Sequence, residues 1–163
     1  MNRWRLSLLA VVMVGALLGR ASADMPDGWS AKDVGPCFVL GGGGEAGGVW
    51  TVKGSGRGIA GTADAFRYVY QPLKGDGTVT VRVASLTNTN EWAKAGIMLR
   101  ASLDCEDAFA MAAVTPANGV RLVSRAQSGT AAAQTEEKAG GAAPYWVRLE
   151  RTGGSVTASC SAD

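Results

Sequence analysis

The sequence predicts an all-β protein in which two antiparallel sheets pack face to face as a sandwich. The prediction rests on about eight or nine short strand-like segments spaced roughly 10 residues apart, and on the turn residues between them. No segment clearly predicts a helix, because apolar residues do not recur at helical spacing over a sufficient length. A β-solenoid would show a fixed repeat, and the sequence contains none.

The central stretch, residues 61–100, carries the clearest strand patterns. In residues 65–71 the aromatic Phe66, Tyr68 and Tyr70 fall on one face with Arg67, Val69 and Gln71 on the other, and valine alternates with threonine or arginine in residues 78–83. Such period-two patterns predict half-buried strands. Pro72 ends the first strand, and the Gly-Asp-Gly at 75–77 marks a turn. We therefore expect the two strands to form a hairpin or to lie as near neighbours.

Other segments show the same strand signals more weakly. Further strands are expected at residues 37–40, 49–53, 95–100, 108–114, 120–125, 145–151 and 155–160. Residues 108–114 are rich in alanine, so a helix is an alternative by propensity. Turn signals on both sides leave no room for a long helix, which favours a strand there. Gly153 and Gly154 predict a two-residue hairpin turn between the last two strands.

Three segments predict connections. Residues 26–36 are polar and rich in turn residues, which indicates an irregular lead-in. The glycine-rich residues 41–48 predict a flexible loop, since they lack the Lys-Ser/Thr ending and the following helix of a phosphate-binding loop. Residues 127–143 are weakly patterned, and the charged residues 136–138 within them indicate a solvated patch.

The first 23 residues predict a secretory signal peptide. Arg3 and Arg5 make a positive start, residues 6–18 are mostly apolar, and Ala-Ser-Ala at 21–23 predicts cleavage before Asp24. The apolar run is shorter than the roughly 20 residues that span a bilayer. We therefore expect an extracellular or periplasmic protein with no membrane span after cleavage.

Residues 24–163 form one predicted domain of near-neutral charge. Three of the 16 basic residues would leave with the signal peptide, so 13 would remain against 14 acidic residues. This balance gives no reason to expect nucleic-acid binding. Cys37, Cys105 and Cys160 leave the disulfide state open between one bridge with a buried thiol and three buried thiols. The absence of histidine excludes Ser-His-Asp and Cys-His nucleophilic machinery and His-ligated zinc.

Three segments of the chain resemble a known family. They are GTADAFRYVYQPLKGDGTVTVRVASLTNTNEWAKAGIMLRAS at residues 61–102, AVTPANGVRL at 113–122 and APYWVRLERTGG at 143–154. They are similar to secreted bacterial modules of the concanavalin A-like lectin/glucanase superfamily, often called regulation-of-enolase-type or LamG-like jelly-roll domains. The resemblance covers roughly residues 29–163 and is most specific in WAKAGIMLR at 92–100.

The resemblance implies a two-sheet antiparallel jelly-roll sandwich for residues 24–163. Members of the family usually continue beyond the equivalent of residues 161–163 into further strands. The domain is therefore expected to be C-terminally incomplete and to lack its last strands. Residues 37–40 would then be a strand that is partly unpaired, and an exposed apolar edge of this kind invites association.

The loop at residues 87–94 is the main candidate for ligand contact, because sugar binding needs an aromatic face beside polar groups. The candidate ligand-binding residues are Trp92, Asn88, Asn90, Glu91, Lys94 and Arg100. The alternative is that Trp92 closes the end of the sandwich and the asparagines form turns. A second hypothesis collects strand arginines on one sheet as a basic surface for acidic glycans, and its alternative is an ordinary solvated face whose arginines pair with residues such as Glu150. Those arginines are Arg67, Arg82, Arg100, Arg121 and Arg148.

Catalysis and metal binding find weaker support. The Glu-x-Asp-x-x-Glu pattern of glucanases in the superfamily is missing, and the adjacent acids at 106–107 and 136–137 would point to opposite faces of a strand. No cofactor is expected, although Asp64 and Asp107 are chemically suitable for Ca²⁺. The expected function is a secreted non-catalytic module that binds an extracellular glycan or a surface protein. A structural or protein-interaction sandwich without a glycan ligand is the alternative, and a glycoside hydrolase or lyase is a third.

Overall fold

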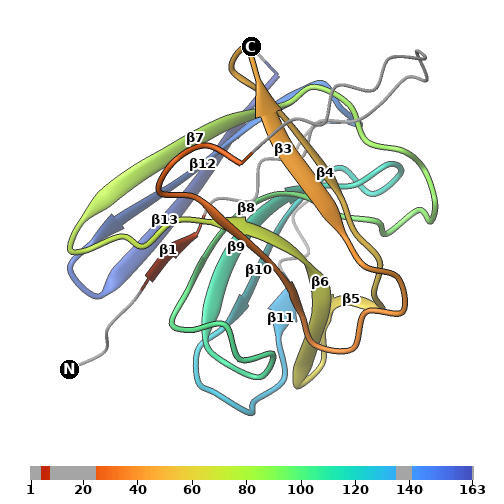
Figure 1. Cartoon of the computed structure of the whole chain (residues 1–163). Coiled ribbons are helices and arrows are strands. Elements are labelled where there is room, and N and C mark those ends of the chain that lie inside the picture. The colour runs from red at the N-terminus through yellow and green to blue at the C-terminus, as the bar shows by residue number, and fades with distance from the viewer. Residues whose placement is uncertain (1–4, 8–24, 135–140, 163) are drawn as a thin grey trace.

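The computed structural model describes residues 5–7, 25–134 and 141–162. The chain is all-β, and the described residues form thirteen strands and no helix (Figure 1). The strands are β1 (Arg5–Ser7), β2 (Ser30–Val34), β3 (Gly42–Ala46), β4 (Val49–Lys53), β5 (Gly58–Ala60), β6 (Ala63–Tyr70), β7 (Gly77–Val83), β8 (Ala95–Arg100), β9 (Phe109–Val114), β10 (Val120–Arg125), β11 (Ala133–Gln134), β12 (Tyr145–Thr152) and β13 (Ser155–Ser161).

The strands form four antiparallel groups. The largest is a five-stranded sheet in the order β1-β8-β9-β10-β11. A three-stranded sheet, β13-β12-β7, contacts it through β12 on β8 and β9 and through β7 on β8. A second three-stranded sheet has the order β2-β6-β5, and β3 pairs with β4 alone. In Figure 1 the sheet β13-β12-β7 lies on the left and the β3–β4 hairpin at the upper right. Antiparallel sheets packed on one another are consistent with a β-sandwich.

The core lies between the five-stranded sheet and its neighbours. Val79 and Val83 of β7 and Val147 and Leu149 of β12 are buried, while the residues between them are more exposed. This alternation shows that the sheet β13-β12-β7 has one apolar face turned inward. In contrast, all six residues of β8 are buried, because β8 is covered on both faces. Each large apolar side chain in this core contributes roughly 1.5–3 kcal/mol through its removal from water.

Most of the predicted strands are confirmed. The segments predicted at 49–53, 95–100 and 120–125 coincide with β4, β8 and β10. The alanine-rich segment is β9, one residue shorter than predicted, and the last two predicted strands are the paired β12 and β13. Their register places Thr152 opposite Ser155, so Gly153 and Gly154 form the two-residue turn as predicted.

The predicted strand at residues 37–40 is wrong, because these residues form an irregular loop. The hydroxyl oxygen of Ser55 accepts a hydrogen bond from the Val39 amide at 3.0 Å. The same hydroxyl group donates to the Val39 carbonyl at 2.7 Å. A side chain thus satisfies the backbone groups that a neighbouring strand would otherwise pair with. The apolar side chains of Phe38 and Leu40 are left 77% and 90% exposed.

The predictions on either side of that loop are also wrong. The predicted lead-in at 26–36 contains β2, which pairs with β6. The predicted flexible loop at 41–48 is the β3–β4 hairpin, with Ala46 opposite Val49. Its two central residues, Gly47 and Gly48, have φ angles of 59° and 82°. Positive φ at both positions is the requirement of a type I′ turn, which glycine meets without strain.

The predicted pairing of the two central strands is wrong as well. Strand β6 pairs with β2 and β5, whereas β7 pairs with β12, far along the chain. Both segments are strands, as predicted, but alternation within a strand does not specify its partner. The predicted loop at 127–143 includes the short β11, and its charged patch at 136–138 lies outside the described residues.

Most of the predicted signal peptide, residues 1–4 and 8–24, lies outside the described residues. Its described part is β1, which pairs antiparallel with β8 so that Leu6 lies opposite Leu99. Within the part of the chain that the structure describes, no helix is long and apolar enough to cross a membrane.

Candidate binding groove

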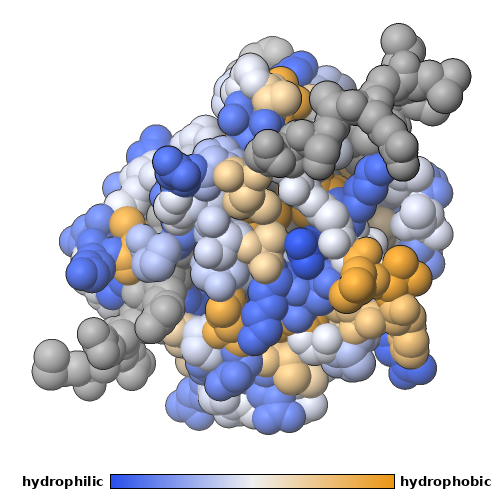
Figure 2. Space-filling model, viewed as in Figure 1, coloured by the Kyte–Doolittle hydropathy of each residue, from blue (hydrophilic) through white to orange (hydrophobic). Residues whose placement is uncertain are grey.

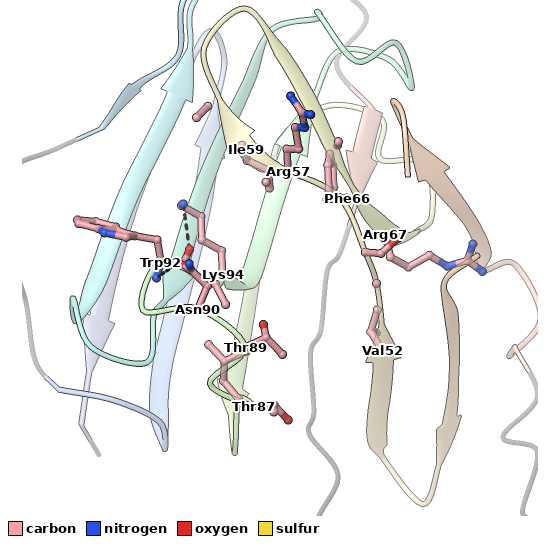
Figure 3. Close-up of a pocket in the computed structure, with 18 of the residues that line it drawn as sticks. Val52, Arg57, Ile59, Phe66, Arg67, Thr87, Thr89, Asn90, Trp92 and Lys94 are labelled. Carbon is pink, nitrogen blue, oxygen red and sulfur yellow. Dashed lines mark hydrogen bonds between the residues drawn. The ribbon is translucent and has the colours of Figure 1, made fainter. Parts of the chain in front are cut away.

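An open pocket of about 880 Å³ lies between β6, the β4–β5 connection and the β7–β8 connection (Figure 3). We call this pocket the groove. Its described lining residues are Val52, Lys53, Gly54, Ser55, Gly56, Arg57, Gly58, Ile59, Ala60, Ala65, Phe66, Arg67, Leu86, Thr87, Thr89, Asn90, Trp92, Ala93, Lys94 and Gln134. It is the place where part of the predicted ligand-binding loop meets residues from the segments 52–60 and 65–67.

Apolar side chains form the floor of the groove. Val52, Ile59 and Phe66 are all at least nine-tenths buried and come from β4, β5 and β6. The Phe66 ring packs edge to face on Tyr68, with ring centroids 5.4 Å apart, and lies 5.5 Å from the Arg100 guanidinium carbon. These contacts hold the Phe66 ring in place, and the charged lining residues lie around this apolar floor.

The wall from the β7–β8 connection is organised around Asn90. The Asn90 side-chain oxygen accepts a hydrogen bond from the Trp92 amide at 2.8 Å, and its backbone carbonyl accepts one from the Ala93 amide at 2.9 Å. The indole N–H of Trp92 donates to Glu91 Oε1 at 3.1 Å, and Asn118 donates to the Glu91 carbonyl at 3.0 Å. Asn90 is therefore a turn residue, as the alternative interpretation expected.

Trp92 is not a buried plug. Its side chain is 40% exposed, and the Arg121 guanidinium carbon lies 5.4 Å from its ring centroid. The cation–π contact and the hydrogen bond to Glu91 fix the indole in one orientation. A fixed, partly exposed aromatic ring at the rim of a groove offers a ready contact surface, because little side-chain freedom is lost on binding.

Lys94 is the most unusual charged group of the groove. Its ammonium group donates a hydrogen bond to the Trp92 carbonyl at 3.2 Å, as the dashed line in Figure 3 shows. The side chain is partly buried, and this burial lowers the pKa of the ammonium group below its ordinary value of 10.5. Desolvation disfavours the charged form of a lysine, and a nearby anion would restore it.

The charged lining residues of the groove are all basic. Lys53, Arg57, Arg67 and Lys94 line it, and the described lining includes no aspartate or glutamate. Arg67 is already neutralised by Asp33, with Nη1 and Oδ2 3.1 Å apart. Figure 3 shows the Arg67 guanidinium turned away from Trp92 and Lys94. Lys53, Arg57 and Lys94 form no ion pair with any described residue.

The structure places the predicted ligand-binding residues unequally. Asn90, Trp92 and Lys94 line the groove. Asn88 and Glu91 lie in the same loop and are exposed, but they are not part of the lining. The β4–β5 connection, with Arg57, was missed by sequence reasoning. Its signal was a basic residue within the glycine-rich Gly-Ser-Gly-Arg-Gly at 54–58.

Arg100 is not available to a ligand, which corrects its prediction as a binding residue. Its side chain is 1% exposed and forms an ion pair with Asp64, with Nη1 3.0 Å from Oδ2. Its Nε group also donates to the Ser102 carbonyl at 2.7 Å. Alternation in the sequence of β8 predicted that Arg100 lies on the exposed face of the strand. In the structure both faces of β8 are buried, so Arg100 is buried too.

A second arginine completes a buried cluster around Asp64. Arg125 Nη2 lies 2.7 Å from Asp64 Oδ1, and Arg125 Nη1 lies 2.9 Å from Asp64 Oδ2. Arg125 also donates to the backbone carbonyls of Gly61, Asp107 and Thr130 at 3.1, 3.1 and 2.9 Å. Both carboxylate oxygens of Asp64 therefore contact arginines, and Arg125 ties three loops to the end of the sheet.

The calcium hypothesis finds no ligand cluster. Both Asp64 oxygens accept hydrogen bonds from arginine, and Asp107 Oδ1 accepts one from the Ala108 amide at 2.8 Å. No group of three or more His, Cys, Asp or Glu side chains poised to hold a metal occurs in residues 5–7, 25–134 and 141–162.

The strand arginines do not form the single basic surface of the second hypothesis, because they are spread over three sheets, and Arg148 pairs with Glu150 as the alternative expected. Arg67 lies in β6, Arg82 and Arg148 lie in β7 and β12, and Arg100 and Arg121 lie in the five-stranded sheet. Alternation within each strand defines a face but not the sheet to which that face belongs.

The three cysteines are free thiols. Neither expected arrangement holds, because no bridge forms and Cys160 is exposed while Cys37 and Cys105 are partly buried. Burial, aided by the negative charge of Asp33, raises the pKa of the Cys37 thiol above its ordinary value of 9.0.

No family model, curated protein or solved structure matches the chain.

Proposed function

We propose that this protein is a secreted, non-catalytic jelly-roll module that binds a carbohydrate in the groove. The observation that carries the proposal is the position of Trp92, a fixed and 40% exposed indole beside a groove of about 880 Å³. Pockets for small ligands combine apolar and aromatic surface with a few placed polar groups, and the groove has this composition.

The groove offers groups that suit both the apolar face and the polar edges of a sugar ring. A pyranose ring presents C–H groups on one face and hydroxyl groups at its edges. The indole of Trp92 supplies a large rigid surface at low cost in side-chain entropy. Thr89, Asn90 and Lys94 supply hydroxyl, amide and ammonium groups from the same loop.

Binding accounts for these residues better than hydrolysis does. Glycosidases place two carboxyl groups across the bond that they cleave. The described lining of the groove includes no carboxyl group, and the chain has no histidine to act as a general acid or base.

The sequence supports the finer fold and the compartment in this proposal. The segments at 61–102, 113–122 and 143–154 resemble jelly-roll modules of the concanavalin A-like superfamily. The pattern of residues 1–23 is that of a secretory signal. A shallow sugar-binding groove on a β-sandwich agrees with both.

Binding of the purified protein to a panel of polysaccharides, measured by affinity electrophoresis and calorimetry, tests this proposal. We expect Trp92→Ala to lower the affinity for the best ligand about tenfold, or about 1.4 kcal/mol. Trp146→Ala is the matched control, because Trp146 is 38% exposed but does not line the groove. Equal losses in the two variants would refute the site, and no binding across the panel would refute the function.

A second candidate function is self-association through the loop at residues 37–40. Phe38, Val39 and Leu40 are 77%, 67% and 90% exposed, and Ser55 holds the loop through the Val39 backbone. Figure 2 shows apolar residues gathered on this face of the molecule. Contiguous exposed apolar groups often mark interaction sites. Sedimentation velocity would show a dimer that Phe38→Ser with Leu40→Ser abolishes, whereas a monomeric wild-type protein would exclude this function.

A further inference from the structure

The charges of the groove are more one-sided than the charge of the chain. The chain as a whole has 16 basic and 14 acidic residues, which is close to balance. The described lining of the groove has four basic residues, Lys53, Arg57, Arg67 and Lys94, and no acidic residue. The positive character of the groove is therefore a local feature that the overall composition does not explain.

Three acidic residues near the groove each interact with a residue other than Arg57 and Lys94. Asp33 neutralises Arg67, and Asp64 is held between Arg100 and Arg125 in the buried cluster. The Glu91 carboxylate accepts a hydrogen bond from the indole of Trp92. None of these three carboxylates forms an ion pair with Arg57 or Lys94. A ligand entering the groove meets cations that the described carboxylates leave uncompensated.

Two of the basic lining residues that form no ion pair with a described residue, Arg57 and Lys94, come from different walls of the groove. Arg57 belongs to the β4–β5 connection and Lys94 to the β7–β8 connection (Figure 3). A guanidinium group binds planar carboxylates and sulfates through two parallel hydrogen bonds, whereas an ammonium group acts as a point charge. Lys94 is partly buried without an acidic partner, so an anion beside it would offset the desolvation of its charge.

We infer that the groove selects saccharides that carry carboxylate or sulfate groups, with Arg57 and Lys94 as the residues that read the negative charge. This inference rests on the proposed function, because it assigns a ligand class to the same groove. Trp92 contacts the sugar ring whatever its charge, and the two cations distinguish an acidic sugar from a neutral one.

Matched pairs of charged and neutral polymers test the inference. The pairs are polygalacturonate with its fully methyl-esterified form, which removes carboxylates, and dextran sulfate with dextran, which separates sulfate from carboxylate recognition. Affinities are measured with the purified protein by affinity electrophoresis at physiological salt, where weak non-specific attraction is screened. We expect at least tenfold tighter binding of the charged member of one pair.

Variants then assign the selectivity to the groove. Arg57→Gln and Lys94→Gln should each lower the ratio of the affinity for the charged polymer to the affinity for the neutral polymer at least fivefold. Lys74→Gln removes the same charge from an exposed loop outside the groove and serves as the control. Circular dichroism spectra confirm that each variant is folded.

The outcomes separate the inference from the proposed function. Equal binding of both members of each pair overturns the charge selectivity, while Trp92-dependent binding keeps the proposed function. Binding of no polymer overturns both. A preference for the charged polymer that Lys74→Gln weakens as much as Arg57→Gln shows long-range attraction only, and overturns the assignment to the groove.

Discussion

Asp64 shows how one buried residue can organise a set of loops. Its carboxylate holds Arg100 and Arg125, and all three side chains are at most 1% exposed. The two arginines also contact the Phe109 ring, with guanidinium carbons 5.7 and 5.0 Å from its centroid. A buried charge is tolerated only when it is paired and hydrogen-bonded, and this cluster meets that condition.

Asp64→Asn should therefore be strongly destabilising. The substitution keeps the size of the side chain but leaves two buried guanidinium groups without a counter-charge, at an expected cost of about 3–5 kcal/mol in the free energy of unfolding. Urea denaturation measures the change. Glu150→Gln is the control, because its ion pair with Arg148 is nearly half exposed and should contribute about 0–1 kcal/mol. Similar values for the two variants would contradict a structural role for the cluster.

The lowered pKa of Lys94 predicts a pH dependence of ligand binding. If the ammonium group contacts an acidic sugar, affinity for the charged polymer should fall as the pH rises through the Lys94 pKa, which lies below 10.5. The carboxylates of the polymer stay ionised throughout this range. Titration of affinity against pH measures the effect.

Lys94→Arg provides the comparison, because an arginine keeps its charge at every pH in this range. Its affinity should stay level where the wild-type affinity falls. A parallel fall in both proteins would show that another group is responsible.

At the scale of elements, β8 and β9 approach each other unusually closely at Gly96. A Cβ atom added to Gly96 would lie 2.0 Å from the Ala112 carbonyl oxygen and 2.8 Å from the Ala113 Cα. Both atoms belong to the backbone of β9, which cannot move aside as a flexible side chain can. The small residue is required by the neighbouring strand and not by the conformation of Gly96 itself.

Gly96→Ala should thus separate β8 from β9 and destabilise the protein by about 1–3 kcal/mol or more. Gly154→Ala is the matched control, because an added Cβ there meets nothing within 4 Å. Thermal unfolding followed by circular dichroism compares the two variants. An unchanged melting temperature in Gly96→Ala would show that the sheet can open without cost at this point.

Elements also show how much of the fold could be predicted. Strands β4, β8, β10, β12 and β13 follow from alternation and turn residues in the sequence. Strand β3, with three consecutive glycines, has no such pattern and exists because β4 pairs with it across the Gly47–Gly48 turn. Residues 37–40 have side chains typical of a strand. However, the Ser55 hydroxyl group forms hydrogen bonds with the amide and carbonyl groups of Val39, which a neighbouring strand would otherwise pair with.

At the scale of the whole molecule, apolar residues divide sharply between core and surface. Leu149 in β12 is fully buried between the sheets, whereas Leu40 is 90% exposed in the loop after β2. Leu40 ends the apolar run at 37–40, whereas Leu149 lies between Arg148 and Glu150, so the packing of the sheets and not the local hydrophobicity decides which leucine is buried. This difference in exposure between the two leucines shows that the core lies between the sheets.

Leu149→Ala should lower the free energy of unfolding by about 2–5 kcal/mol, because it removes buried methyl groups and leaves a cavity. Leu40→Ala should change it by no more than about 0.5 kcal/mol, as is usual for surface substitutions. Urea denaturation of both variants measures the pair. A large loss in Leu40→Ala would mean that the loop is covered in the folded protein.

Of the two walls of the groove, only the one formed by the loop at 87–94 could be predicted from the sequence. The loop at 87–94 concentrates aromatic and polar residues, and Asn90, Trp92 and Lys94 do line the groove. The opposite wall, with Arg57, was not predicted, since its proximity depends on how β5 and β6 pair. Arg100 was predicted at the surface because alternation in one strand cannot show that a second sheet covers it.

The sequence by itself determined that this protein is all-β, where most of its strands and turns lie, and which loop concentrates aromatic and polar residues. These properties depend on side chains within a few positions of one another, where period-two alternation and turn residues act directly. Only the tertiary structure decided which strands pair, which arginines are buried and which residues line the groove together with Trp92. Asp64 and Arg125 are 61 residues apart, and contacts over such distances arise from the packing of the whole chain.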